Sequence, residues 1–160
     1  MALEAFLKEC DIFSDLNDAQ LKKLVAISKE KTFAPGTLLY RIGYPSTHLN
    51  LVEKGKVFLQ MIADMGPAVP PMSFTADVVT RRDAFGWSAF DEPNLHTMNA
   101  LIADPATLIT IKGEKLKAMM EQDCEMGYEI MKGLSRLLAS RLDQARMLLI
   151  SERALALTGD

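Results

Sequence analysis

The sequence of 160 residues has only two cysteines and no long hydrophobic run, and both shortages exclude classes of protein. Cys10 and Cys124 form no CxxC motif and cannot supply the four thiolates of an iron–sulfur cluster, so two unpaired thiols are expected. The longest aliphatic runs, such as residues 147–150, have about four residues, whereas a membrane-spanning helix needs about 20. We therefore expect neither a transmembrane segment nor a membrane partner.

A strong charge of one sign is also missing from the sequence. The 18 Lys and Arg side chains nearly balance the 21 Asp and Glu side chains, which leaves a net charge of −3. A dedicated nucleic-acid-binding protein usually has a basic face, so this balance argues against that class. The first eight residues contain no basic region before an apolar stretch and are not typical of a signal peptide, so we expect a cytoplasmic protein.

The spacing of apolar residues divides the chain into three parts, which we interpret as a single domain over residues 1–160. Residues 1–30 have the three- and four-residue spacing of helices, with Asn17-Asp18 as a candidate N-cap. Residues 31–112 contain short apolar runs separated by glycine and proline, which is typical of a small antiparallel β-structure. Residues 113–155 return to helical spacing. The predicted strands cover residues 31–33, 38–41, 49–53, 56–62, 72–79, 99–103 and 107–112.

Residues 125–154 form one long helical pattern without proline, and its apolar residues make a near-heptad stripe. A helix of about thirty residues is about 45 Å long, more than a domain of this size needs to cover its core. We therefore expect part of the stripe to form a homodimer contact with the same helix of a second copy. The alternative is that the whole stripe packs on the β-structure. The stripe consists of Met131, Leu134, Leu138, Leu142, Ala145 and Leu149.

Four segments are informative when their spacings are taken together: residues 32–57, 83–90, 96–100 and 107–116. The first segment places Gly36, Gly43 and Gly55 where tight turns between strands need a positive φ, which glycine adopts most easily. Together the four segments resemble the cyclic nucleotide-binding domain of catabolite-activator (CRP/FNR) regulators and of kinase regulatory subunits. The resemblance covers nearly the whole chain.

This resemblance implies a mixed α+β fold and a non-enzymatic regulatory function. The family fold is an antiparallel eight-stranded β-roll, a double-stranded β-helix or cupin-like jelly roll, with N-terminal helices and a long C-terminal helix. In the bacterial regulators a helix-turn-helix module follows the long helix, whereas this sequence ends at Asp160, a few residues beyond it. We therefore expect no direct DNA binding by this chain.

The resemblance also places a degenerate phosphate-binding cassette on Phe85, Gly86, Trp87, Ser88, Ala89, His96 and Thr97. In the family, a glutamate at the position of Trp87 accepts a hydrogen bond from the ribose, and an arginine at the position of His96 pairs with the cyclic phosphate. An indole cannot accept a hydrogen bond, and histidine has no guanidinium group. The module is therefore expected to have altered or lost cyclic-nucleotide affinity.

Two alternatives follow from the altered cassette. A different small anionic molecule could occupy the pocket as the effector. The pocket could instead be collapsed around Trp87, in a structural or protein-interaction module that kept the roll and lost the pocket.

The sequence gives no sign of a catalytic or metal centre. Ser88 does not stand in a Gly-x-Ser-x-Gly elbow and has no evident histidine–carboxylate relay. His48 and His96 are the only histidines and lie in distant segments, too few for a cupin metal site or a haem with two protein ligands. We expect no catalytic residues, no metal and no cofactor.

Overall fold

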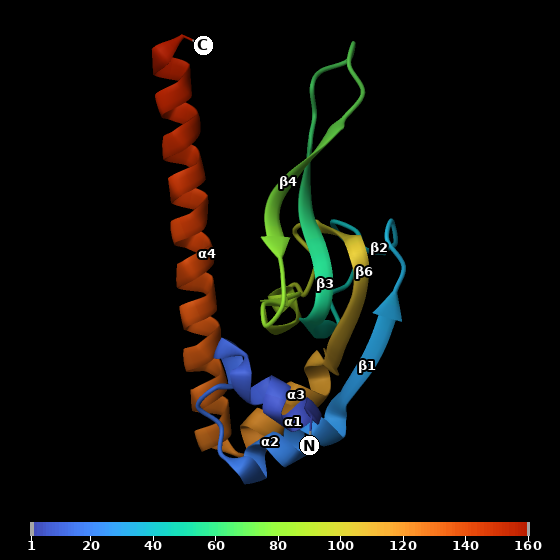
Figure 1. Ribbon diagram of the computed structural model, residues 1–160, viewed down its shortest axis with the longest axis vertical. Helices are drawn as coiled ribbons and strands as arrows, with labels where there is room; N and C mark the ends of the chain where they lie inside the picture. The colour runs from blue at the N-terminus through green and yellow to red at the C-terminus, as the bar shows by residue number, and fades with distance from the viewer. Residues whose placement is uncertain (1, 160) are drawn as a thin grey trace.

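An antiparallel sheet forms the centre of the fold, and three helices pack at one end of it (Figure 1). The computed structural model describes residues 2–159. Four strands are hydrogen-bonded in the order β1-β6-β3-β4, while β2 pairs with β6 and β5 pairs with β3. The helices are α1 (Ala2–Glu9), η1 (Asp11–Phe13), α2 (Asp18–Ile27), η2 (Trp87–Phe90), α3 (Gly113–Gln122) and α4 (Cys124–Thr158). The strands are β1 (Ser28–Phe33), β2 (Leu38–Tyr40), β3 (His48–Ala63), β4 (Met72–Val79), β5 (Ala84–Phe85) and β6 (Asn99–Lys112).

Residues 2–159 contain six strands, so the expected count of eight is not confirmed. Two pairs of predicted strands are each joined into one long strand, the first pair as β3 and the second as β6. The register between these strands shifts three times between Val52 and Val57, which lets them bend without ending. Gly55, which indicated a turn, marks this bend with a φ of 89°, and a Cβ there would lie 2.8 Å from the Cα of Ala106.

The boundaries of the first part also differ from the prediction. The N-cap at Asn17 is confirmed, because its side chain accepts a hydrogen bond from the Gln20 amide and the Gln20 side chain accepts one from the Asn17 amide. The helix ends at Ile27, however, and β1 begins at Ser28 within the segment predicted to be helical. The strand β5 was not predicted, because two residues are too few to show a period.

Alternation along β3 and β6 separates two hydrophobic clusters. Leu49 and Leu51 face the helices and pack in one cluster with Phe13. Val52 and Leu108 face the interior of the roll and pack in the other. The first cluster therefore attaches the helices to the sheet, and the second fills the roll.

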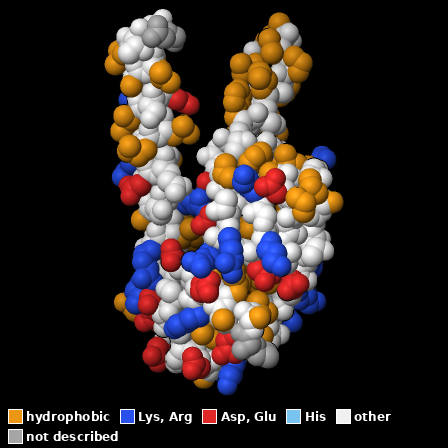
Figure 2. Space-filling model, viewed as in Figure 1, with side chains coloured by type: hydrophobic (Ala, Val, Ile, Leu, Met, Phe, Trp, Pro, Cys, Tyr) orange, Lys and Arg blue, Asp and Glu red, His pale blue; other side chains and the backbone are white. Residues whose placement is uncertain are grey.

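The long helix α4 is attached to the domain only through its first half. Its N-terminus is capped by the Asp123 side chain, which accepts a hydrogen bond from the Met126 amide at 3.0 Å. All residues from Leu142 to Gly159 are exposed, and the 35-residue helix is about 52 Å long. Its second half and the hairpin of β3 and β4 therefore project as two separate arms, both bearing hydrophobic side chains (Figure 2). Among the described residues, no helix combines the length and the apolar character needed to cross a membrane.

We predict that Gly133→Ala destabilises the protein, although alanine favours a helix over glycine by about 1 kcal/mol. A Cβ at this position would lie 2.5 Å from the carbonyl oxygen and 2.7 Å from the Cα of Ile12, and these backbone atoms cannot turn aside as a flexible side chain can. The expected loss in the free energy of unfolding, measured in urea, is about 1–3 kcal/mol.

The matched control is Ser135→Ala, an exposed position two residues further along α4, which should change the free energy of unfolding by less than about 0.5 kcal/mol. A Gly133→Ala variant as stable as the original protein would show that α4 does not need its close approach to Ile12.

Candidate functional site

The first half of the cassette is held in place by β5 and a left-handed glycine. Phe85 pairs with Asn50 of β3, and Gly86 follows with a φ of 83° before η2 begins at Trp87. A Cβ on Gly86 would lie 2.7 Å from the carbonyl oxygen of His48, so both backbone conformation and space require glycine here. Phe85 and Ala89 are buried in the domain, and Ser88 is half-buried.

Trp87 lies where the ribose contact was expected, and its ring is half-buried between the two hydrophobic clusters. The cavity that remains beside Gly86, Ser88 and Thr97 has a volume of only about 10 Å³. A single water molecule needs about 10–15 Å³ on this scale. This cavity is therefore too small to hold a nucleotide.

His96, at the position of the family arginine, is neutral and stacked. Its ring lies parallel to Tyr40 with 3.5 Å between the ring centroids and 4° between the planes. Burial lowers the pKa of His96, and only 7% of the residue is exposed. Its backbone amide donates to the Tyr44 carbonyl at 2.9 Å, and its carbonyl accepts from the Gly43 amide at 2.8 Å. The cassette thus has no charged side chain at the phosphate position.

The two halves of the cassette are joined by Asn94, a residue that the sequence analysis did not identify. Asn94 has a φ of 58°, a conformation that asparagine tolerates better than most residues. Its side-chain amide donates to the carbonyls of Ser88 at 3.1 Å and Ala89 at 3.0 Å. Thr97 lies beyond this loop and is exposed.

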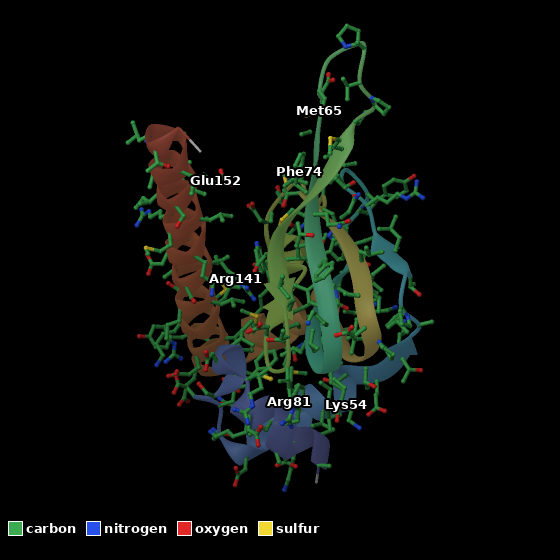
Figure 3. The ribbon with its side chains drawn as sticks, turned by 45° about the horizontal axis from the view of Figure 1, so that its top comes forward. Lys54, Met65, Phe74, Arg81, Arg141 and Glu152 are labelled. Carbon is green, nitrogen blue, oxygen red and sulfur yellow. The ribbon has the colours of Figure 1, made fainter. Side chains whose placement is uncertain are left out.

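Arg141 ties α4 to the start of the cassette (Figure 3). Its Nη1 lies 2.7 Å from Oδ1 of Asp77 on β4, and its Nη2 lies 3.6 Å from Oδ2 of Asp83, the residue before β5. Burial raises the pKa of Asp77 even though the guanidinium of Arg141 opposes the shift. The Nε of Arg141 is buried without an acceptor among the described residues. This ion pair is therefore a costly contact that fixes where the free part of α4 begins.

The stripe proposed for dimer formation divides at this attachment. Leu134 is 4% exposed and packs in the core of its own chain, so it is not free to contact a partner. The remaining positions are exposed: Met131, Leu138, Leu142, Ala145 and Leu149.

The two cysteines lie in different environments. Burial raises the pKa of the Cys10 thiol to about 12, which keeps it protonated, and Cys124 is exposed at the start of α4. Both thiols are free, as the sequence predicted.

Solved structures of other proteins share this architecture. A cyclic nucleotide-binding domain from Methylobacillus flagellatus superposes with a TM-score of 0.79 at 14% identity, covering 94% of this chain and 82% of that one. A candidate cyclic nucleotide-binding protein from Geobacter metallireducens gives 0.73 at 25% identity, covering 89% and 98%. The catabolite activator protein of Thermus thermophilus gives 0.71 at 19% identity, covering 89% and 63%. No protein-family model matches the chain, and no curated protein matches its sequence.

The structure is thus a mixed α+β domain with an antiparallel sheet and a long C-terminal helix, an architecture shared with bacterial regulators. More narrowly, it is a domain of the cyclic nucleotide-binding fold of the catabolite-activator type, as the sequence resemblance indicated.

The two histidines predict how stability depends on pH. The pKa of each is lowered in the folded protein, His96 by burial and His48 by burial and then by Lys31, so the folded state binds fewer protons than the unfolded chain. This contribution to stability is complete above pH 6.5 and is lost as the pH falls through 6.5 toward the folded pKa values. His96→Gln should therefore reduce the fall in the free energy of unfolding between neutral pH and about pH 5, measured in urea.

His48→Gln should remove part of the same dependence, and the double variant should have the flattest profile above the range where carboxylates titrate. A His96→Gln variant with the original pH dependence would mean that the stacked ring accepts a proton without cost.

Proposed function

We propose that the chain is a non-enzymatic, cytoplasmic regulatory module whose usual cyclic-nucleotide pocket is closed by Trp87. The observation that carries the proposal is the volume of about 10 Å³ left beside the half-buried indole. The neutral, stacked His96 supports it, because a cyclic phosphate would find neither a positive charge nor a guanidinium group. The similar folds of a cyclic nucleotide-binding domain and of a catabolite activator protein support the regulatory role.

The same proposal includes a homodimer formed through α4. Beyond Arg141 the helix makes no contact that buries it, yet it carries many large apolar side chains. Such a surface is unfavourable in water and is typical of an interaction site. A second copy of the helix matches it in length and has the near-heptad spacing that two-stranded helical pairs use. The exposed apolar residues of this part are Leu142, Met147, Leu148, Leu149, Ile150, Leu155 and Leu157.

The closed pocket predicts that the protein shows no binding heat with cAMP or cGMP in calorimetry. The double variant Trp87→Glu, His96→Arg removes the indole and supplies both family anchors. Each charged hydrogen bond contributes about 1.5–3 kcal/mol, so the affinity for cAMP should rise about a hundredfold or more.

The matched control is Trp87→Ala, His96→Ala, which opens the same space without the charges and should gain much less affinity. Micromolar cAMP binding by the unchanged protein would contradict the proposal. If the Trp87→Glu, His96→Arg variant folds but shows no binding of cAMP, the result would favour the alternative, a structural or protein-interaction module that kept the roll and lost the pocket.

The dimer predicts that Leu142→Glu lowers the mass in sedimentation equilibrium from two chains to one. Leu142 is 51% exposed and lies beyond the last attachment of α4, so the change should not unfold the domain. Ser151→Glu is the control, since nine residues are 2.5 helical turns and place it on the face opposite Leu142, beside Met147 and Leu148, which lie outside the stripe. Equal masses for Leu142→Glu and the original protein would show that the stripe is not the dimer contact.

A further inference from the structure

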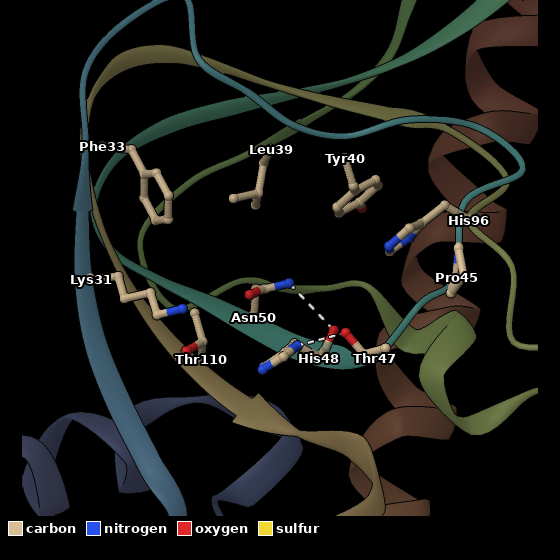
Figure 4. Close-up of a pocket in the computed structure, with 10 residues that line it drawn as sticks. All are labelled: Lys31, Phe33, Leu39, Tyr40, Pro45, Thr47, His48, Asn50, His96 and Thr110. Atoms are coloured by element: carbon tan, nitrogen blue, oxygen red, sulfur yellow. Dashed lines mark hydrogen bonds between the residues drawn. The ribbon is translucent and has the colours of Figure 1, made fainter.

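Tyr40 and His96 also line a second, larger cavity (Figure 4). Its volume is about 180 Å³, against about 10 Å³ on the cassette side, and both rings line both cavities. It opens at the end of the roll where β1, the start of β3 and the end of β6 meet. The closure of the cassette by Trp87 therefore does not close this space.

One wall of the cavity is polar and positively charged. Lys31 lines it and makes no ion pair with any of residues 2–159, and no acidic side chain is among the lining residues. On β1, Lys31 shares its strand face with Phe33, where alternation would ordinarily place another apolar residue. Burial lowers the pKa of His48, and the positive charges of Lys31, Lys112 and Lys29 lower it further. The positive charge of this wall favours binding of an anion over binding of a cation.

Behind the lysine lie two buried polar side chains with donors that are poorly used. Asn50 on β3 is directly opposite Thr110 on β6, and they are 5% and 6% exposed. The Asn50 amide donates to the His48 carbonyl, and the Thr110 hydroxyl donates to the Lys29 carbonyl, both at 3.4 Å. Good hydrogen bonds of this kind are about 2.7–3.2 Å long, and an asparagine amide has two N–H donors. The second N–H of Asn50 can therefore donate to a ligand, and the single proton of the Thr110 hydroxyl can turn from its long bond to Lys29 to do the same.

The opposite wall is apolar. Phe33, Leu39 and Tyr40 lie along one side of the cavity, facing the polar row of Lys31, Asn50 and Thr110 (Figure 4). A dry cavity of about 150 Å³ is known to hold one benzene molecule, so this space suits an apolar body of that size. A ligand that satisfies both walls has a small apolar body and one anionic group.

We propose that this cavity binds a small organic carboxylate, with the carboxylate at Lys31, Asn50 and Thr110 and the apolar body against Phe33, Leu39 and Tyr40. The inference gives the proposed regulatory module a class of ligand and rests on that proposal for its role. Binding itself is independent of the cassette and of the dimer contact. Calorimetry with cAMP and sedimentation test those separately, so a failure of one proposal is distinguishable from a failure of the other.

The test is an NMR titration of the full chain with benzoate as the probe, up to about 10 mM, well above a dissociation constant near 1 mM. Amide shifts should change at Phe33, Asn50 and Thr110 rather than at Ser88 and Thr97. Benzyl alcohol has the ring without the charge, and inorganic phosphate has the charge without the ring. Each should bind at least about tenfold more weakly than benzoate.

Two variants and one control variant test the assignment to the polar wall. Lys31→Met keeps an unbranched side chain of similar length and removes its charge, and it should weaken benzoate binding about tenfold. Lys29→Met makes the same change in net charge two residues earlier on the same face of β1. Lys29 does not line the cavity, so this variant should change the affinity for benzoate less than about threefold. Thr110→Val, which keeps the shape and removes the hydroxyl, should also weaken binding.

Four results would overturn the inference: no site-specific shifts with benzoate; shifts centred on the cassette; equal binding of benzoate and either partial probe; or equal losses in Lys31→Met and Lys29→Met, which would indicate a general attraction for anions.

Discussion

The long antiparallel pairing of β3 with β6 is the constraint on which the other features depend. It runs from the His48–Lys112 pair to the Gln60–Asn99 pair and passes through the bend at Gly55. Because side chains alternate along paired strands, this register decides which residues meet the helices and which fill the roll. It also positions the cassette, since β5 pairs with β3 beside this ladder. A shift of one residue would exchange Leu49 and Leu51 with Asn50 and bury the polar row under the helices.

The same register explains why the two cavities differ so much. The interior face of β3 reads Val52 and then Asn50 toward the end of the roll, so the apolar filling stops where the polar row begins. Trp87 fills the cassette side because an indole packs against both hydrophobic clusters at once. In the cavity beside Lys31, Phe33 and Leu39 line one wall without filling the space. Closure of one cavity and persistence of the other therefore have separate local causes.

Local signals made much of this fold predictable from the sequence. The turn glycines, the N-cap at Asn17 and the apolar alternation depend on near neighbours along the chain. The strand count was less predictable, because a glycine at a bulge and a glycine at a turn have the same sequence signature. Leu134 fits the stripe by spacing, but the crossing of α4 over Ile12 buries it, and spacing alone carries no information about such a crossing.

The candidate site, too, was only partly predictable from the sequence. The missing glutamate and arginine could be identified from the sequence, since the cassette occupies a short segment at known spacing. The stacking of His96 on Tyr40 could not, because the two residues are 56 positions apart and meet only when β2 pairs with β6. The cavity beside Lys31 depends on side chains from four strands, β1, β2, β3 and β6, and was likewise not predictable from any one segment.

A cassette built from Trp87 and His96 has a different cost of folding from one built from a glutamate and an arginine. A buried arginine and glutamate lose hydration when the roll folds, and a ligand that pairs with them offsets that cost. Trp87 and the neutral His96 carry no such cost, so this part of the roll needs no charged ligand to offset it. The costly charge that remains is Arg141, and it lies at the junction of α4 with Asp77 and Asp83 rather than in the pocket. If the roll signals to the free half of α4, the signal would have to act on contacts around this junction, because every residue from Leu142 to Gly159 is exposed.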